Sequence, residues 1–163
     1  MIPSALADPR TLRRAFGAFA TGVTVITTGG KTPHGMTANS FASVSLDPPL
    51  VLVCIGRDAI MHHCLDASFG VSVLAAGQEA LARHFADRRR PLGAAQFEGI
   101  GHRLGTRTGV PLLGGAVAHF ECELWRTYDG GDHTIFLGRV LDLARSEDGD
   151  ALVFVDGGFR SAA

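Results

Sequence analysis

The chain has 163 residues, the length of a single domain, and its formal net charge of −1 provides no general attraction for nucleic acid or anionic lipid. Hydrophobic residues make up 46% of the sequence and charged residues 19%, which excludes an intrinsically disordered chain. The longest strongly apolar run, residues 50–55, is far shorter than the roughly 20 residues that cross a bilayer as a helix, so no membrane segment is expected.

The cysteines indicate a reducing compartment. There are three, Cys54, Cys64 and Cys122, and they form no CxxC pair of the kind that favours a disulfide framework or a zinc site. The N-terminus has neither the basic nor the apolar region of an export signal. We therefore expect a cytoplasmic protein with one domain over residues 1–163, in which residues 1–8 form a flexible extension.

An amphipathic helix is expected near the N-terminus. Asp8 is a typical N-cap and Pro9 a typical first helical residue. The apolar residues that follow are spaced at helical intervals as far as Phe19. Gly22 is expected to stop this helix.

Most of the remaining elements are predicted to be strands. Their apolar or β-branched runs are bounded by Gly, Pro and Asp. In the expected strand 41–46, Ser43 and Ser45 lie on the polar face. The last three are joined by turns rich in Gly and Asp, which is typical of hairpins. The expected strands are residues 23–28, 34–38, 41–46, 50–55, 69–74, 117–128, 133–143 and 151–155.

Two short helices and a long irregular region lie between these strands. Asp58 is expected to cap a helix that carries Met61 and Leu65, and residues 78–85 predict a second helix. Residues 87–115 are rich in Arg, Gly and Pro with little periodicity, so we expect long loops around one short strand.

The expected fold is mainly β with a few helices. Consecutive hairpins imply an antiparallel sheet, and six or more strands favour a closed barrel, because closure removes exposed strand edges. A doubly wound parallel fold ranks second, since helices alternate with strands only in the first half of the chain.

The densest polar cluster is residues 34–45, which offer hydroxyls, an amide and main-chain donors within one strand-turn-strand unit. These groups suit a phosphate or the edge of a heterocycle, although a plain polar edge hairpin explains the same residues. The sequence has no Walker A, GxGxxG or GxSxG motif. It therefore excludes a P-loop, a Rossmann dinucleotide site and the usual hydrolase elbow.

Two other features have both a functional and a structural interpretation. His133 begins a strand after a Gly-rich turn, where it can face a cleft, or it is a turn histidine bonded to Asp132. The run Arg88-Arg89-Arg90 is either a solvated loop or a source of charge for a phosphate. His62 and His63 are adjacent on a helix and cannot easily bind one ion, so no metal site is expected.

Several motifs, taken in order, closely resemble the flavin reductase family, the small components of two-component flavin-dependent monooxygenases. The motifs are FGAFATGVTVITT at 16–28, HGMTANSF at 34–41, SVSLDPPLVL at 43–52, GDH at 131–133, GRV at 138–140, LVF at 152–154 and GGF at 157–159. The resemblance implies an antiparallel split β-barrel of the FMN-binding type, usually a homodimer. It also implies hydride transfer from NADH or NADPH to FMN or FAD, followed by release of reduced flavin to a separate monooxygenase.

The resemblance also implies roles for individual residues. It assigns His133 to nicotinamide contact, and Gly157, Gly158 and Phe159 to the segment beside the pyridine nucleotide. Cys54, otherwise expected to be an inert thiol, and Ile55 end the strand beneath the flavin, and Phe85 and Ala86 form an aromatic-small pair near it. The flavin ring edge and the ribityl phosphate side are assigned to Thr37, Ala38, Asn39, Ser40, Ser43, Val44 and Ser45.

The sequence departs from the family pattern at two places. Ile60 and Met61 stand where many members carry a small hydroxyl residue, so one phosphate contact is either lost or replaced by Arg57 or His62. Gln96 precedes Phe97 where lysine is frequent.

Two rival functions use the same barrel. One is a flavin-binding module without reductase activity, acting as a sensor or carrier. The other is an oxidase of the pyridoxamine phosphate oxidase type, for which only residues 88–90 supply the basic character.

Overall fold

The computed structural model describes residues 4–163, so residues 1–3 of the expected flexible extension lie outside the described part. The elements of the first half are η1 Ser4–Ala7, α1 Pro9–Gly17, β1 Thr21–Gly22, β2 Thr24–Thr28, β3 His34–Ala38, β4 Ala42–Leu46, β5 Pro49–Gly56, α2 Ile60–Cys64 and β6 Ser68–Val73. Those of the second half are η2 Ala76–Gln78, α3 Glu79–Ala86, η3 Gly93–Phe97, β7 His102–Leu104, β8 Pro111–Leu113, β9 Ala118–Gly130, β10 His133–Arg145, β11 Leu152–Val155 and β12 Gly158–Ser161.

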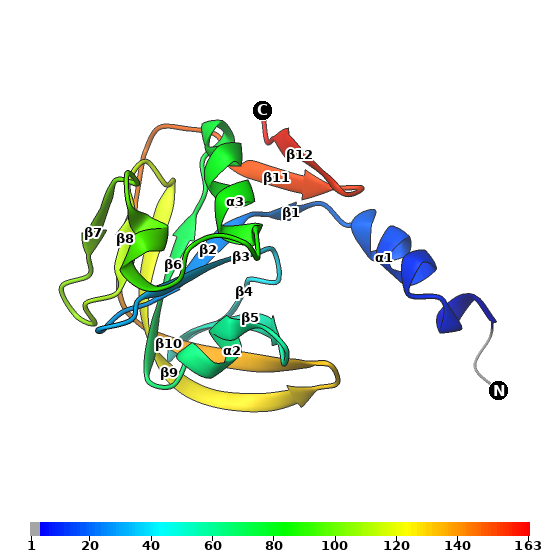
Figure 1. Cartoon of the computed structure of the whole chain (residues 1–163), viewed down its shortest axis with the longest axis horizontal. Helices are drawn as coiled ribbons and strands as arrows, with labels where there is room; N and C mark the ends of the chain where they lie inside the picture. Colours follow the sequence, from blue (N-terminus) through cyan, green and yellow to red (C-terminus); the bar gives the residue numbers. More distant parts are fainter. Residues whose placement is uncertain (1–3) are drawn as a thin grey trace.

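The N-terminal helix starts as expected and ends earlier. The Asp8 carboxylate accepts hydrogen bonds from the backbone N–H groups of Arg10 (3.1 Å) and Thr11 (3.3 Å), which confirms the N-cap. The helix stops at Gly17, whose carbonyl accepts from the N–H of Asp156 at 2.7 Å. Gly22 is not the stop, because it pairs with Val153 in β1. A tertiary contact therefore ends α1, and the helix projects from the body of the protein (Figure 1).

The main sheet is antiparallel and has the order β3-β2-β6-β9-β10-β5-β4. The expected antiparallel split β-barrel is confirmed, but the full closure inferred from the number of strands is wrong. Within residues 4–163 the strands β3 and β4 are the two edges of this sheet and do not pair with each other. A register shift between Ser43 and Ser45 bends β4, and its polar residues tolerate water, so the edge needs no closure.

Two smaller sheets complete the fold. β1, β11 and β12 form a three-stranded sheet, and β7 pairs with β8. The segment 87–115 thus contains two short strands where one was expected. The N-cap of α2 is Ala59 without a side-chain hydrogen bond, so the predicted Asp58 cap is wrong. The Asp58 carboxylate instead pairs with Arg88 at 3.4 Å.

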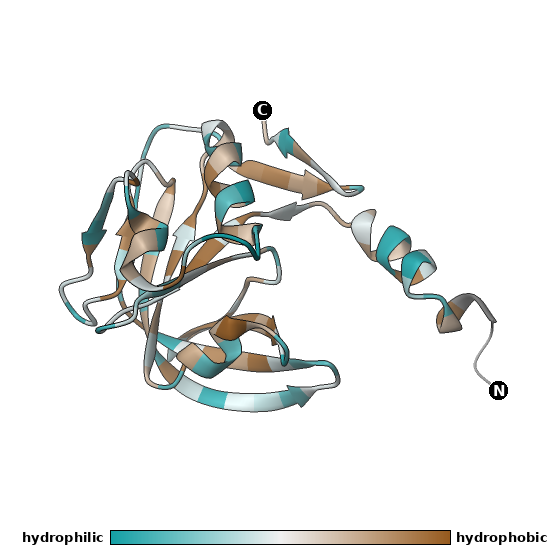
Figure 2. Ribbon diagram, viewed as in Figure 1, coloured by the Kyte–Doolittle hydropathy of each residue, from teal (hydrophilic) through white to brown (hydrophobic). Residues whose placement is uncertain are grey.

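Two hydrophobic cores share strand β2, which is buried along its whole length. Ile26 faces a core inside the curved sheet with residues such as Phe69 and Ile55, whereas Val25 faces a second core with Phe85 of α3 and Leu152 of β11. The alternation along β2 is that of a strand covered on both faces. Figure 2 shows the corresponding hydrophobic stretches on β5 and β11. β2 is therefore packed on both of its faces.

Among the described residues there is no helix long and apolar enough to cross a membrane.

Candidate functional site

The polar cluster predicted from the sequence lies at the split of the main sheet. Thr37 and Ala38 end β3, and Asn39 and Ser40 lead across to β4, which carries Ser43, Val44 and Ser45. β3 pairs with β2 alone and β4 with β5 alone among the described strands. Gly35 of β3 already uses its N–H and carbonyl to bond Gln96 and Arg90, and the outer edges of both strands are otherwise free of a neighbouring strand, so a ligand can approach them there.

Two hydroxyls of this cluster are engaged within the protein. The Thr37 hydroxyl donates to the Ala82 carbonyl of α3 at 2.7 Å. The Ser40 hydroxyl donates to the Cys54 carbonyl at 2.8 Å and accepts from the Cys54 N–H at 3.1 Å. Because each hydroxyl already donates its hydrogen to a backbone carbonyl, it can only accept a hydrogen bond from a ligand. Asn39 and Ser43 are exposed and keep their full capacity.

His133 stands at the first position of β10, opposite Gly56 of β5. Its Nδ1 lies 2.6 Å from the Asp132 carboxylate, and half of its side chain is exposed. Because this hydrogen bond holds the charged form of the carboxyl group, the pKa of Asp132 lies below its ordinary value. The turn contact considered from the sequence therefore exists, and the other ring nitrogen remains for a ligand.

Arg57 fixes the hairpin turn that carries His133. Its Nε donates to the Gly131 carbonyl at 2.8 Å, a terminal nitrogen pairs with Asp129 at 2.6 Å, and its N–H donates to the Asp132 carbonyl at 3.0 Å. Arg57 therefore holds the end of β5 against the β9–β10 turn. His62, the other expected replacement for a phosphate contact, is within 2.8 Å of the Thr134 hydroxyl.

Four residues expected near a flavin differ in accessibility. The side chains of Ile55 and Phe85 are buried in the two cores, so a ligand could meet only their backbone or a ring edge. Cys54 is half-buried, and burial raises the pKa of its thiol, which keeps it protonated. Ala86 is exposed at the end of α3.

Phe85 packs so closely on β3 that a Cβ at Gly35 would lie 2.7 Å from its ring, so this glycine makes room for an aromatic side chain.

The C-terminal motif forms a tight turn away from the split. Asp156 (φ 49°) and Gly157 (φ 74°) are the two central residues between paired Val155 and Gly158, the arrangement of a type I′ hairpin. Gly157 lines a separate cavity of about 490 Å³ with Arg13 and Arg14 of α1. Phe159 lies under the Arg83 guanidinium at 5.0 Å, on the α3 side of this hairpin.

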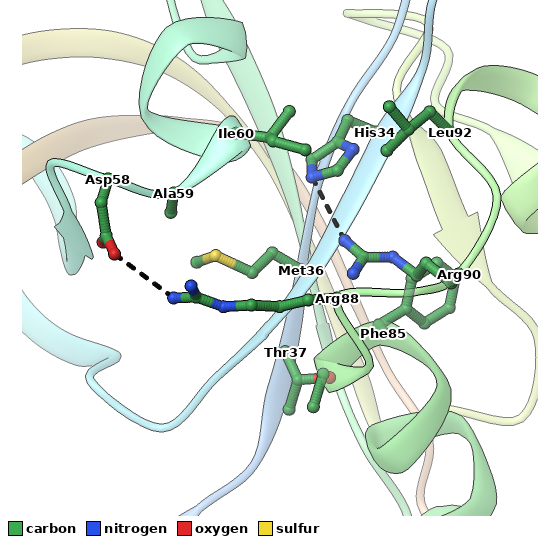
Figure 3. Close-up of a pocket in the computed structure, with 11 residues that line it drawn as sticks. His34, Met36, Thr37, Asp58, Ala59, Ile60, Phe85, Arg88, Arg90 and Leu92 are labelled. Carbon is green, nitrogen blue, oxygen red and sulfur yellow. Dashed lines mark hydrogen bonds and ion pairs between the residues drawn. The ribbon is translucent and has the colours of Figure 1, made fainter.

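The cavity next to the split has a volume of about 430 Å³ (Figure 3). Of the residues that the sequence assigned to a flavin, Thr37, Phe85 and Ala86 line it. Ala59, Leu92 and Asp58 also line it but were not anticipated as site residues. Asp58 and Ala59 directly precede α2, whereas Leu92 belongs to the 87–92 loop, and no local pattern reveals that these two segments meet at one cavity. His34, Met36, Ile60, Arg88 and Arg90 complete the lining.

A buried hydrogen-bond network holds this loop on β3. The Gln96 amide is buried, and its oxygen accepts from the Gly35 N–H at 2.9 Å. Arg90 donates to the Asp87 carbonyl at 2.8 Å and to the Gly35 carbonyl, and contacts Nε2 of His34 at 3.2 Å. Burial and the Arg90 charge lower the pKa of His34 to about 4, so the ring is neutral at pH 7.

The chain is similar to known proteins over nearly its whole length. Residues 16–163 match the family model described as flavin reductase like domain. An NADH-dependent FAD reductase of Streptomyces globisporus is 56% identical over 166 aligned positions, which cover 99% of this chain and 91% of the relative.

Two solved structures are similar over nearly the whole chain. The NADH:FAD oxidoreductase of Streptomyces globisporus C-1027, in complex with NAD and FAD fragments, has a TM-score of 0.91 and 54% identity, covering 96% of this chain and 94% of that one. BorF, the flavin reductase component of a bacterial two-component tryptophan halogenase, has a TM-score of 0.91 and 58% identity, covering 94% of this chain and 98% of that one.

Proposed function

Because the chain belongs to the family of flavin reductase like proteins, we propose that it is an NADH-dependent flavin reductase. It transfers a hydride from NADH to oxidised FMN or FAD and releases reduced flavin to a separate flavin-dependent enzyme. The observation that carries this proposal is the family match over residues 16–163, together with 54% to 58% identity to solved flavin reductases. We also propose that residues 1–163 form one domain.

The residues at the split fit a flavin. A flavin is already a competent electron acceptor, so the protein must chiefly bind it and hold the nicotinamide against it. The unpaired edges of β3 and β4 supply main-chain donors and acceptors for the ring edge, and Asn39 and Ser43 add exposed polar groups. We assign Thr37, Ala38, Asn39, Ser40, Ser43, Val44 and Ser45 to this ring, with Cys54, Ile55, Phe85 and Ala86 around it.

Arg57 takes a different role from the one that the family resemblance suggested. Its guanidinium is directed at Asp129 and Gly131 in the β9–β10 turn, so we assign it to positioning His133 instead of to a phosphate. Gly157 and Phe159 remain the residues that we assign to the nucleotide.

Replacing His133 with Ala is expected to raise the KM for NADH or slow hydride transfer, lowering kcat/KM about tenfold, while flavin binding changes little. The reason is that His133 is half exposed at the strand end and we assign it to nicotinamide contact. Stopped-flow kinetics and flavin fluorescence titration measure the two effects. An equal loss of flavin affinity and turnover would contradict this role.

The activity itself is tested by anaerobic stopped-flow absorbance at the oxidised-flavin band. The full chain with FMN or FAD is mixed with NADH and, separately, with NADPH. Rapid bleaching with NADH is expected, and the four combinations give both specificities. A band that persists with either nucleotide while flavin stays bound would contradict the reductase and indicate a flavin-binding module.

We also propose that the chain forms a homodimer. Phe16 in the last turn of the projecting α1 and Phe19 just beyond it are 72% and 78% exposed, and Leu46 of β4 is 96% exposed. Such apolar side chains are costly in water and are typical of a surface covered by a partner. A second copy of this chain would cover them and keep α1 in place.

The double variant Phe16→Ser/Phe19→Ser is expected to shift the protein from twice its 17.1 kDa mass to the monomer. Sedimentation equilibrium measures the mass, and Arg10→Ala on the same helix is the matched control. A wild-type protein that sediments as a monomer would contradict the homodimer.

The partner and the compartment follow from the same proposal. BorF is one component of a two-component system, which supports a partner that receives reduced flavin, and we propose a monooxygenase. The three cysteines are unpaired, which supports the cytoplasm as the compartment.

A further inference from the structure

We propose that the outer edge of β7, with the groove beside it, is a docking site for an extended acidic segment of a partner protein. The segment would add a strand to β7 and place a bulky apolar side chain in the groove. Figure 1 shows β7 at the border of the molecule opposite α1. Within the described chain, none of the residues that we assign to the flavin or the nucleotide lines this groove, so the inference does not depend on the proposed function.

The first observation is a strand edge whose main-chain groups have no partner. β7 pairs only with β8 among residues 4–163. The Gly105 N–H donates to the Val110 carbonyl at 2.8 Å, one position beyond the paired Leu104 and Pro111. In an antiparallel pair, positions that bond across the ladder alternate with positions that point away from it. The N–H and carbonyl groups of His102 and Leu104 therefore point away from β8 and are free to pair with a further strand.

The outer edge of β8, in contrast, is already used. The Pro111 carbonyl accepts from the Thr27 hydroxyl at 2.5 Å, and the Leu113 N–H donates to the Ser72 hydroxyl at 3.0 Å. Both bonds point away from β7 and attach β8 to the main sheet. The β7 edge is therefore the side of this two-stranded sheet on which a partner strand can be added.

The second observation is the groove itself, which has a volume of about 500 Å³. This volume lies within the range of roughly 300–1,000 Å³ typical of binding pockets. His102 and Leu104 lie on the same face of β7, and both line the groove together with Phe97 and Pro111. Leu104 is 61% exposed, and the His102 ring lies 5.4 Å from that of Phe97. An added strand directs alternate side chains to this face, so the groove can receive one of them.

Glycines leave space for a large side chain in this groove. Gly29 lies so close to Gly109 that a Cβ built on it would be 2.9 Å from the Gly109 carbonyl oxygen, so the two turns meet at one end of the groove. Nothing lies within 4 Å of a Cβ built at Gly30 or Gly109, which also line the groove. The open space and the apolar lining favour an aromatic side chain.

The third observation is an excess of positive charge around this edge. Lys31 follows Gly30 at the rim, Arg103 lies on β7 and Arg107 lies in the turn after it, and all three are exposed. In residues 4–163 none of them pairs with a carboxylate. Glu98 is the one acidic residue in the described lining. The surplus favours an acidic segment, and it opposes pairing of two β7 strands from copies of this chain, because like charges would meet.

The test is a titration of the full chain, without flavin or NADH, with the peptide Asp-Thr-Val-Phe-Val-Thr-Asp blocked at both ends. Proton–nitrogen correlation NMR follows the amides of His102 and Leu104. Both signals are expected to shift, with a dissociation constant below roughly 1 mM. If neither signal shifts at roughly 1 mM peptide, the docking site is wrong. Because no flavin is present, a failure of the proposed reductase activity leaves this result unaffected.

Two variants of the edge have matched controls elsewhere on the surface. Leu104→Ser is expected to weaken peptide binding about fivefold to tenfold, and Arg103→Ala about twofold to threefold. Leu143→Ser removes a leucine that is 62% exposed on β10, outside the groove, and Arg145→Ala removes an exposed arginine of the same strand. Neither control should change the dissociation constant. Equal weakening by Leu104→Ser and Leu143→Ser would contradict a site at β7.

N-methylated peptides distinguish strand addition from apolar contact alone. Alternate N–H groups of an added strand face β7, so methylation of the odd positions and of the even positions should differ, one of them weakening binding about tenfold. Equal affinities of the two peptides would overturn strand addition.

Sedimentation equilibrium tests whether a second copy of this chain occupies the edge instead. The wild type and Leu104→Ser are expected to have the same mass. A smaller mass for the variant would overturn the proposal in favour of a second copy.

Discussion

Replacing Glu121 with Ala is expected to lower the free energy of unfolding by about 1 to 3 kcal/mol, measured by urea denaturation. Glu121 lies near the start of β9 and is 2% exposed. One of its carboxylate oxygens accepts from the N–H groups of Arg107 (3.0 Å) and Thr108 (2.9 Å) and from the Thr108 hydroxyl (2.8 Å). Without the carboxylate these donors lose their partner and the loop between β7 and β8 loses its anchor.

The pKa of Glu121 reflects the same contacts. Burial raises this pKa, but the hydrogen bonds from Thr108 and from the backbone of residues 106–108 outweigh burial, so it lies below its ordinary value of 4.5. A carboxyl group whose pKa is lowered in the folded state stabilises the fold at any pH above its ordinary, unfolded pKa. This contribution is lost as the pH falls through the lower pKa of the folded state. Acid should therefore release the β7–β8 loop.

The matched control is Glu123→Ala, two residues further along the same strand. Glu123 pairs with Arg139 at the surface, where such pairs contribute about 0 to 1 kcal/mol. If Glu121→Ala and Glu123→Ala lowered the free energy of unfolding by similar amounts, the buried carboxylate of Glu121 would contribute no more to stability than a surface ion pair.

Acid is expected to destabilise the protein by about 3 kcal/mol through His34 alone as the pH falls from 6.5 to 4. The folded pKa of His34, about 4, lies below the ordinary 6.5, because the ring is buried and faces the Arg90 cation. Above pH 6.5 the ring is neutral in both states and contributes no pH dependence. Between 6.5 and 4 the unfolded chain binds the proton more readily, so stability decreases as the pH falls.

Urea unfolding of the wild type and of His34→Gln at several pH values between 7 and 4 measures this contribution. The variant cannot titrate at this position, so the difference in unfolding free energy between the two proteins should change by about 3 kcal/mol across the window. A difference that stays constant with pH would contradict the assignment. Since the same network holds the 87–92 loop on β3, beside the residues that we assign to the flavin, flavin affinity should fall over the same pH range.

Local sequence patterns predicted most of the elements, because their causes are local. The Asp8 cap, the β-branched run of β2 and the Gly-rich turn before β10 depend on neighbouring residues, and the structure has them within one or two positions. The polar residues 37–45 were found for the same reason, since they are concentrated in one segment. The motif order was sufficient to identify the family.

Contacts between distant segments were not visible in the sequence. α1 ends at Gly17 because the β11–β12 turn binds its carbonyl, Asp58 pairs with Arg88 instead of capping α2, and β7 pairs with β8 around the carboxylate of Glu121. The first two depend on partners 30 or more residues away, and the Glu121 carboxylate is 13 or more residues from the loop that it holds, so spacing and propensity carry no signal for these contacts.

The sequence by itself determined the family, the antiparallel class and the polar segment at the split, because strand periodicity and motif order are properties of consecutive residues. Only the tertiary structure decided that the split stays open between β3 and β4, that Arg57 holds the turn before His133, and that Arg88 and Arg90 line one cavity together with Ile60 and Leu92. The physical reason is that burial and charge pairing are settled by which segments meet when the chain packs, and each segment alone is compatible with several partners.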